Sequence, residues 1–345
     1  MLSLPEVISD EAALEDFQTT PTEDLIESLG RLDGNLLVLG VGGKMGPTLA
    51  RLARRALDAG RSGARVIGVS RFSDPVAERR LQEAGVETIS ADLLEEGTLA
   101  RLPDAPNVIF MAGRKFGSTG AEELTWAMNT YLPALVAQRY RDSRIVVFST
   151  GNVYPLTPVS QGGATETTPV APIGEYAQSC LGRERMFQYF SSQYGTQVSI
   201  VRLNYAIDLR YGILFDVASR VWRGDPIDVT MGNVNVIWQG DANRVVLRSL
   251  DACASPPTVL NLTGPETVSV RYLANRFGQC FDRAPVVVGE EAPTALLSNA
   301  ARAQHRFGYP RVPLDAMVRW TAQWVAEGGR SLGKPTHYET RDGKF

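Results

Sequence analysis

Glycines recur at every third position in one short stretch near the start of the chain. A short apolar run precedes them, and a segment with helical character begins at Pro47. A buried strand that ends in a glycine turn before a helix presents backbone N–H groups, and the positive end of that helix, to a pyrophosphate. The pattern therefore indicates a dinucleotide site, although a tight turn without a ligand could use the same glycines. The predicted phosphate loop comprises Gly40, Gly43, Lys44, Met45 and Gly46.

The end of the second predicted strand, 65–69, bears on which dinucleotide binds. An acidic residue at this place accepts the ribose hydroxyls of NAD, whereas an arginine nearby accommodates a 2′-phosphate. This chain has Ser70 and Arg71 there and no carboxylate. Because a hydroxyl beside a guanidinium suits a phosphate, the sequence favours NADP. The alternative is NAD, with Arg71 stacked on the adenine.

Composition excludes several other classes of protein. The 345 residues carry a net charge of −3 with no basic block, which argues against a nucleic-acid partner. No apolar run approaches the length of a membrane span, and no secretory signal is recognisable. The odd number of cysteines, without paired spacing, indicates reduced thiols in a cytosol. With only His305 and His337, a histidine-rich metal centre is excluded. We expect a cytoplasmic protein that acts on a small molecule and holds no metal.

Apolar strands alternate with amphipathic helices over the first two thirds of the chain. This alternation requires a parallel sheet that is covered on both faces. With a phosphate loop after the first strand, it predicts an α/β protein with a doubly wound Rossmann sheet. The predicted strands are 36–39, 65–69, 87–90, 107–111, 144–148 and 197–203.

Beyond residue 204 the pattern changes, which predicts a smaller substrate lobe. Thr20, Pro21 and Glu23 have the form of a capping box and predict a helix in the N-terminal extension that ends near Gly30. The polar tail is expected to be mobile or to reach a partner subunit. The predicted regions are a helical extension (1–34), a dinucleotide-binding Rossmann domain (35–204), a mainly substrate-binding lobe with segments returning to the sheet (205–330), and a tail (331–345).

Taken together, these features resemble the extended short-chain dehydrogenase/reductase family, the group of NAD-dependent epimerases and dehydratases. The resemblance spans roughly residues 35–326. Besides the glycine loop, it is carried by Ala91-Asp92-Leu93 after the third strand, Ala112-Gly113 after the fourth, Asn129 in the next helix and Ser149–Tyr154 after the fifth.

The resemblance implies a role for each matching position. The three glycines would hold the pyrophosphate. Asp92 and Leu93 would contact the adenine, and Ala112 and Gly113 would line the cofactor cleft. It further implies that Thr150 hydrogen-bonds the reacting oxygen of the substrate. Tyr176 would exchange a proton as hydride moves to or from the nicotinamide.

One position departs from the family pattern. The family has Tyr-x-x-x-Lys, whereas this chain has Tyr176 followed four residues later by Cys180. Positions four apart share a helix face, so the lysine would lie beside the phenol and favour its ionised form. A free tyrosine, with a pKa of about 10, is a poor base at neutral pH.

Three basic residues could replace the missing lysine. Lys115 and Arg114 follow Ala112-Gly113 on a loop that should face the cleft, and Arg183 lies two turns beyond Tyr176 on the same helix face. Solvated loop charges, or contacts to a substrate phosphate, are the alternative interpretation. Cys180 is interpreted as a small apolar filler rather than a nucleophile.

The sequence thus predicts an NAD(P)-dependent epimerase/dehydratase or reductase acting on a sugar or a related hydroxy/keto compound. The predicted catalytic residues are Thr150, Tyr176 and Lys115. A second hypothesis is a cofactor-binding protein without hydride chemistry, serving as a redox sensor or a partner subunit. The family resemblance further implies a homodimer that pairs helices near 121–139 and 175–194.

Overall fold

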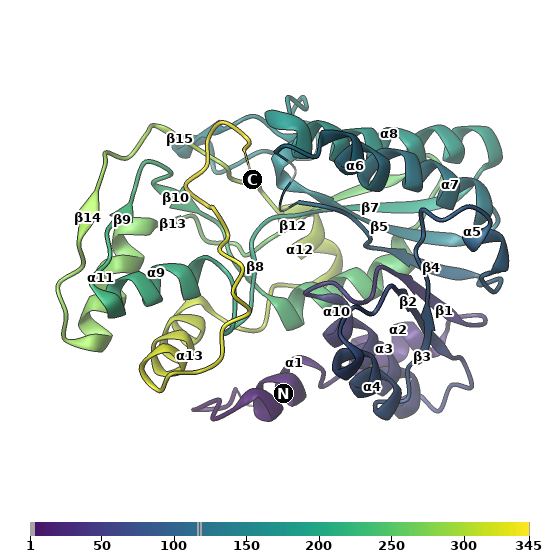
Figure 1. The fold of residues 1–345 in the computed structure, drawn as a ribbon, viewed down its shortest axis with the longest axis horizontal. Coiled ribbons are helices and arrows are strands. Elements are labelled where there is room, and N and C mark those ends of the chain that lie inside the picture. Colours follow the sequence, from purple (N-terminus) through teal and green to yellow (C-terminus); the bar gives the residue numbers. More distant parts are fainter. Residues whose placement is uncertain (1–3, 116, 118, 345) are drawn as a thin grey trace.

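The computed structural model describes residues 4–115, 117 and 119–344 (Figure 1). Residues 1–3 of the predicted extension and residue 345 of the predicted tail lie outside the described residues. A parallel sheet with the strand order β12-β7-β5-β4-β1-β2-β3 forms the centre of the larger part. Its strands are β1 (Leu36–Leu39), β2 (Val66–Ser70), β3 (Glu87–Ser90), β4 (Asn107–Phe110), β5 (Arg144–Thr150), β7 (Gln197–Leu203) and β12 (Thr258–Leu262).

The predicted Rossmann sheet is confirmed, and β12 supplies the predicted return of the C-terminal lobe to it. Strand β1 lies between β2 and β4, with Leu39 opposite both Val69 and Phe110. The three strands therefore end at the same edge of the sheet, where the direction of winding reverses. In open α/β sheets this crevice is where ligands bind.

Helices cover both faces of the sheet (Figure 1). On one face lie α2 (Glu23–Gly30), α3 (Gly46–Ala59), α4 (Pro75–Glu83) and α10 (Gln239–Arg248). The other face carries α6 (Glu122–Trp126), the π-helical turn η1 (Ala127–Tyr131), α7 (Leu132–Arg139) and α8 (Gly174–Tyr194). A short helix, α5 (Thr98–Arg101), precedes β4. Successive residues of β1 enter opposite cores, Val38 with Leu49 and Leu39 with Leu132. Burial on both faces explains why the strand is apolar throughout.

A buried ion pair ties α8 to the sheet. The carboxylate of Glu184 accepts hydrogen bonds from Arg202 of β7, at 2.6 and 2.9 Å, and from the Ser149 hydroxyl of β5. Arg202 also donates to the Tyr154 hydroxyl at 2.7 Å. Both charged groups are satisfied by partners on different elements, so the pair fixes the position of the helix over the strand ends.

The N-terminal extension is helical, but its predicted helix start is wrong. Helix α2 begins at Glu23 with Thr22, rather than Thr20, at the cap position. An additional helix, α1 (Glu11–Gln18), precedes it, capped by Asp10, whose carboxylate accepts from the N–H of Ala13 at 2.8 Å.

The C-terminal lobe packs α9 (Ile213–Arg223), α11 (Val270–Phe281) and α13 (Leu314–Ala326) around an aromatic core, and α12 (Ala301–Phe307) packs on β12. Met317, Trp320 and Trp324 are buried in that core, as predicted. The predicted strand 234–238 is divided in two. Strand β10 (Asn233–Val234) pairs with β13 (Val268–Ser269), whereas β11 (Ile237–Trp238) pairs with β8 (Ala206–Ile207). Two more short pairs join β9 (Ile227–Asp228) to β14 (Val287–Val288) and β6 (Thr157–Pro158) to β15 (Thr294–Ala295).

The tail runs from α13 along the lobe to the start of α8 (Figure 1). The backbone N–H of Thr336 donates to Asp216 at 2.8 Å, and Arg341 donates to the carbonyl of Thr294 at 2.7 Å. Tyr338 is buried in the lobe. The tail is therefore packed, contrary to the expectation of a mobile segment, because its few polar and aromatic side chains find partners in the lobe.

No helix among the described residues has the length and apolar character needed to cross a membrane.

Candidate functional site

A cavity of about 260 Å³ lies between the carboxyl edge of the sheet and the C-terminal lobe. The Rossmann part contributes Thr150 and Tyr176, the lobe contributes Tyr211 and the start of α9, and the tail contributes Thr336. Lys115 also lines the cavity, so it contains all three predicted catalytic residues. The structure thus brings together residues that lie far apart in the sequence.

Close backbone contacts shape the glycine loop. A Cβ at Gly46 would lie 2.1 Å from the carbonyl oxygen of Val41, so no other residue fits without moving the backbone. Gly40 has a φ of +90°, and a Cβ there would lie 2.5 Å from the backbone N of Ala112. These glycines therefore let the backbone turn tightly between β1 and α3.

Within the described residues, the backbone N–H groups of Lys44 and Met45 have no hydrogen-bond acceptor. They lie at the start of the fourteen-residue helix α3, whose dipole favours an anion at this end. Unsatisfied N–H groups beside a helix start are suited to the oxygens of a pyrophosphate. The loop therefore fits the dinucleotide that its sequence pattern indicates.

The predicted adenosine end lies beside the loop. A Cβ at Gly42 would lie 2.4 Å from the Ser70 hydroxyl, so this side chain closes against the glycine loop. Arg71 is 75% exposed, and its guanidinium lies 3.9 Å from the carboxylate of Asp92. Asp92 also accepts from the N–H of Leu94 at 3.0 Å, while Leu93 is buried. The predicted residues meet at one edge, with a guanidinium and a carboxylate both available.

Tyr176 and Thr150 meet inside the cavity. Burial raises the pKa of the Tyr176 phenol, and the neighbouring Cys180 raises it further. The Arg183 charge and a hydrogen bond with the Thr150 side chain lower it. The Thr150 hydroxyl also accepts from the backbone N–H of Asn152 at 3.2 Å and from its side chain at 2.9 Å. Thr150 is thereby held in place at the end of β5.

Cys180 is 1% exposed and packs with Val153 and Tyr154. Burial raises the pKa of its thiol, which stays neutral at ordinary pH. The residue therefore fills space beside Tyr176, as expected, and carries no charge that could replace the family's lysine.

Arg183 is the charged residue most firmly built into the site. Its side chain is 5% exposed and lines the cavity, and within the described residues it makes no ion pair. One guanidinium nitrogen donates to the carbonyl of Phe148 at 2.6 Å, and the other donates to the Asn129 side chain at 2.8 Å. The Nε has no partner. A buried cation without a carboxylate is costly, which makes Arg183 a candidate for a role in the site.

Asn129 connects Arg183 to the loop after β4. Its side-chain oxygen also accepts from the N–H of Arg114, and its nitrogen donates to the carbonyl of Arg114 and to Ser179. Asn129 lies in the π-helical turn η1, a feature often found at functional sites. The sequence identified Asn129 through its family resemblance, but nothing in the local pattern indicated the π-helical turn.

The two loop cations have different environments. The guanidinium of Arg114 donates to the carbonyl of Gly117 at 2.8 and 3.3 Å, so it is committed to its own loop. The ammonium of Lys115 lies 5.8 Å from the ring centroid of Tyr176. Burial lowers the pKa of Lys115 to about 8. Of the two loop candidates, Lys115 is the one that approaches the phenol.

Gly113 leaves room for the guanidinium of Arg183. A Cβ at this position would lie 2.5 Å from a guanidinium nitrogen of Arg183 and 3.0 Å from the Asn129 oxygen. The predicted cleft residue Ala112 is buried under the glycine loop. The close packing of Gly113 thus results from the arginine that lies beneath it.

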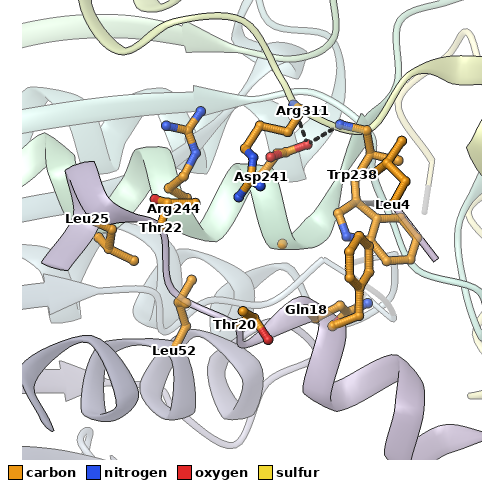
Figure 2. A pocket seen from close by; sticks show the side chains of 13 residues that line it. Leu4, Gln18, Thr20, Thr22, Leu25, Leu52, Trp238, Asp241, Arg244 and Arg311 are labelled. Carbon is orange, nitrogen blue, oxygen red and sulfur yellow. Dashed lines mark hydrogen bonds between the residues drawn. The ribbon is translucent and has the colours of Figure 1, made fainter. Parts of the chain in front are cut away.

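A second, smaller cavity, with a volume of about 40 Å³, lies where the N-terminal segment meets α10. Figure 2 shows the side chains that line it. Asp241 accepts hydrogen bonds there from the backbone N–H groups of Arg311 and Val312 at 2.9 and 3.0 Å. Arg244 is paired with Asp24 at 2.7 Å. None of the predicted site residues lines this cavity, and its volume suits a water molecule rather than a substrate.

Comparison with known proteins agrees with this geometry. The family model described as "NAD dependent epimerase/dehydratase family" matches residues 36–207, about half of the chain. No curated protein matches the chain.

Solved structures similar to this chain include sugar-nucleotide enzymes. UDP-glucose 4-epimerase from Thermotoga maritima, solved with UDP-glucose, is 17% identical with a TM-score of 0.69, covering 85% of this chain and 99% of its own. UDP-glucuronic acid 4-epimerase from Bacillus cereus, solved with NAD, is 16% identical with a TM-score of 0.69, covering 85% and 99%. dTDP-glucose 4,6-dehydratase from Bacillus anthracis, also with NAD, is 14% identical with a TM-score of 0.71, covering 86% and 97%. At these identities the likeness shows the fold.

The packing of Cys180 beside Arg183 yields a stability prediction. A lysine at position 180 would place a second cation next to a buried guanidinium that no carboxylate neutralises. We expect Cys180→Lys to lower the free energy of unfolding by about 3–5 kcal/mol. Adding Arg183→Met should restore part of this loss, because a single cation then remains, although the hydrogen bonds of Arg183 to Phe148 and Asn129 are lost. Denaturant unfolding measures both effects.

Two control variants separate charge from volume and from position. Cys180→Met adds length without charge, and Gln178→Lys adds charge on the exposed side of the same helix. Both should cost clearly less than Cys180→Lys. If the Cys180→Lys protein is as stable as the original, a cation at position 180 is not repelled by Arg183, and the prediction is wrong.

Proposed function

The chain belongs to the NAD dependent epimerase/dehydratase family, and on that premise we propose that it is an enzyme that epimerises, dehydrates or reduces a sugar or related hydroxy/keto compound. The observation that supports this most directly is the meeting of Tyr176 and Thr150 in a cavity that also borders the phosphate loop. When bound there, NAD or NADP supplies the hydride acceptor and donor.

In the proposed reaction, Tyr176 exchanges a proton with the reacting oxygen of the substrate. The Thr150 hydroxyl orients that oxygen and is itself held by Asn152. Because burial raises the pKa of the phenol, Tyr176 stays protonated unless nearby positive charge stabilises its ionised form. The proton transfer therefore depends on the cations around it.

We assign that charge to Lys115 and Arg183 together. Arg183 is fixed by hydrogen bonds to Phe148 and Asn129, and its charge lowers the pKa of Tyr176. Lys115 lies above the ring of Tyr176, and with a pKa of about 8 it can gain or lose a proton near neutral pH. Arg183 supplies the permanent charge, and Lys115 the adjustable one. This pair replaces the lysine that the family carries four residues after its tyrosine.

Nucleotide-linked sugars are the first substrates to test. The similar structures include enzymes named for UDP-glucose, UDP-glucuronic acid and dTDP-glucose. The cavity is lined by residues of the sheet edge, the C-terminal lobe and the tail. The net reaction follows from the products that such a panel yields.

The second hypothesis, a cofactor-binding protein without hydride chemistry, is favoured by a single observation. Cys180, a neutral thiol, takes the place of the expected lysine. Under this hypothesis the dinucleotide site is intact, but proton exchange at Tyr176 is too slow to matter. A tight, stoichiometric dinucleotide with no turnover across a broad panel would favour it over an enzyme.

We also propose a homodimer through α6, η1 and α8. Leu124, Tyr131 and Tyr189 are large apolar side chains exposed on these helices, and Tyr131 is 59% exposed. A second copy that covers this face would bury them. Tyr131→Glu should shift the protein from dimer to monomer in sedimentation velocity. Tyr272→Glu, at a residue that is also more than half exposed but lies on α11, should leave the dimer intact; if both variants behave alike, the interface lies elsewhere.

The role of Tyr176 is tested by Tyr176→Phe, which removes only the hydroxyl. We expect kcat to fall by about 10²- to 10⁴-fold, the usual contribution of a general acid–base group. The dinucleotide Kd should change by less than about twofold, roughly 0.4 kcal/mol. Absorbance of the reduced nicotinamide follows turnover, and titration calorimetry gives the Kd. Tyr272→Phe, on the surface of α11, is the matched control. Unchanged kcat in Tyr176→Phe would remove Tyr176 from the reaction.

We propose NADP as the preferred dinucleotide, because Arg71 directly follows β2 with no acidic residue beside it in the sequence and is largely exposed. Arg71→Ala should weaken NADP binding by roughly tenfold or more, about 1.4 kcal/mol, and NAD binding by less than about twofold. Calorimetric titration with each dinucleotide measures this difference. Equal losses for both would mean that Arg71 contacts the adenine and not a phosphate.

A further inference from the structure

The cavity is strongly basic. Among its described lining residues are Lys44, Arg114, Lys115 and Arg183, and none is acidic. Lysine is scarce in this chain, which has four lysines at positions 44, 115, 334 and 344. Two of the four face this cavity. An excess of positive charge in a partly buried space favours an anionic occupant.

We infer that the cavity contains a subsite for an anionic group of the substrate, a carboxylate or a phosphate, formed by Lys44, Lys115 and the start of α9. The inference rests on the proposed function only in taking this cavity as the place where the substrate binds. It adds that the reacting part of the substrate is itself negatively charged.

Lys44 belongs to the phosphate loop by sequence, but its ammonium is placed in the cavity. The Nζ lies 3.3 Å from the ring centroid of Tyr211, a residue of the C-terminal lobe. The charged groups that affect it are Asp208, Asp216, Lys115 and Lys334, none of which belongs to the loop. The backbone of Lys44 thus faces the pyrophosphate position, while its side chain faces the substrate.

The two arginines are already committed to the protein. Arg114 donates to the carbonyl of Gly117, and Arg183 donates to Phe148 and Asn129. Lys44 differs from them, because within the described residues its ammonium has no carboxylate within ion-pair distance and only the face of Tyr211 beside it. Its remaining hydrogen-bond capacity is open to a ligand.

The nearest carboxylates are also engaged. Asp208 accepts from Arg210 at 2.8 and 3.0 Å and from Gln18 at 2.9 Å. Asp216 accepts from the N–H and the hydroxyl of Thr336, and burial raises its pKa. These acids therefore act on Lys44 from a distance and do not occupy the subsite.

A helix start adds to the positive field. Gly212 and Ile213, the cap and first residue of α9, line the cavity next to Tyr211. The helix has eleven residues, so its dipole and the unpaired N–H groups of its first turn favour an anion at this end. Lys44 and the helix start thus approach the same space from opposite parts of the molecule.

The position of Lys115 places the anionic group near the reacting atoms. Its ammonium is 5.8 Å from the Tyr176 ring centroid, and its charge acts on Lys44. An anion held between these lysines lies on the part of the substrate that reacts with Tyr176. A carboxylated or phosphorylated sugar, or a hydroxy acid, has this property.

The subsite should weaken as the pH rises. Burial, together with repulsion from Lys115 and Lys334, lowers the pKa of Lys44 to about 7, against the attraction of Asp208 and Asp216. Lys115 has a pKa of about 8 beside Cys180 and Tyr176. Both ammonium groups are charged below these values and lose their protons above them. Anion binding is therefore strongest below about pH 7 and declines between about pH 7 and 9.

Lysine footprinting on the full chain, saturated with NAD in every sample, tests the inference without turnover. A neutral acetylating ester reacts with unprotonated lysine, and mass spectrometry quantifies the product at each lysine. Glucuronate and glucose 6-phosphate are the anionic competitors, and glucose is the neutral one. An anion at about four times its Kd should slow acetylation of Lys44 by roughly fivefold, whereas glucose should not. Lys344, exposed at the end of the tail, should be unaffected and is the internal control.

The two anions distinguish the kind of group that binds. Protection by glucuronate alone indicates a carboxylate subsite, and protection by glucose 6-phosphate alone indicates a phosphate subsite. Calorimetry adds a variant arm in which Lys44→Met should abolish the preference for the protecting anion over glucose and Lys44→Arg should retain it. Equal protection by glucose, or no protection by either anion, would overturn the inference. Protection without turnover would contradict the proposed reaction and leave the subsite standing. Turnover of neutral sugars without protection by either anion would support the proposed reaction and overturn the subsite.

Discussion

A buried guanidinium without a carboxylate partner is the constraint on which the site depends. Arg183 is held by a strand-end carbonyl and by Asn129, and Asn129 in turn holds the backbone of the loop that carries Lys115. A side chain at position 113 would displace the guanidinium of Arg183. The end of β5, the π-helical turn and the β4 loop are thus positioned by one charge that the protein keeps away from water.

Helix α8 carries both residues that attach it to the sheet and residues that line the cavity. Glu184, next to Arg183, is turned toward Ser149 and Arg202 and ties the helix to the sheet. Tyr176 and Arg183 line the cavity, and Cys180 packs beside them against Val153 and Tyr154. Because one rigid helix carries both sets, the phenol is placed by the same interactions that hold the fold together. A cation two turns from Tyr176, rather than one, leaves room for a small side chain at position 180.

The cavity itself exists only because three separated segments meet. The phosphate loop extends Lys44 toward Tyr211, the lobe contributes the start of α9, and the tail is fastened to Asp216 through Thr336. The cavity is basic because the nearby carboxylates of Asp208 and Asp216 accept hydrogen bonds from Arg210 and Thr336 and do not line the cavity. The proposed dinucleotide site and the inferred anion subsite are therefore adjacent parts of one crevice.

The sequence by itself determined the parallel sheet, the glycine loop and the residues that the family shares, because these depend on apolar runs and glycine spacing that are local. Local patterns also gave two wrong predictions. The helix predicted to be capped by Thr20 is capped at Thr22, and the strand predicted over 234–238 is divided into two short strands with different partners. Only the tertiary structure decided that Arg183 is buried in the wall of the site, that Arg114 turns away while Lys115 approaches Tyr176, and that the tail closes against the lobe. Those outcomes depend on which long side chains find a partner across elements far apart in the chain, and no spacing within one segment contains that information.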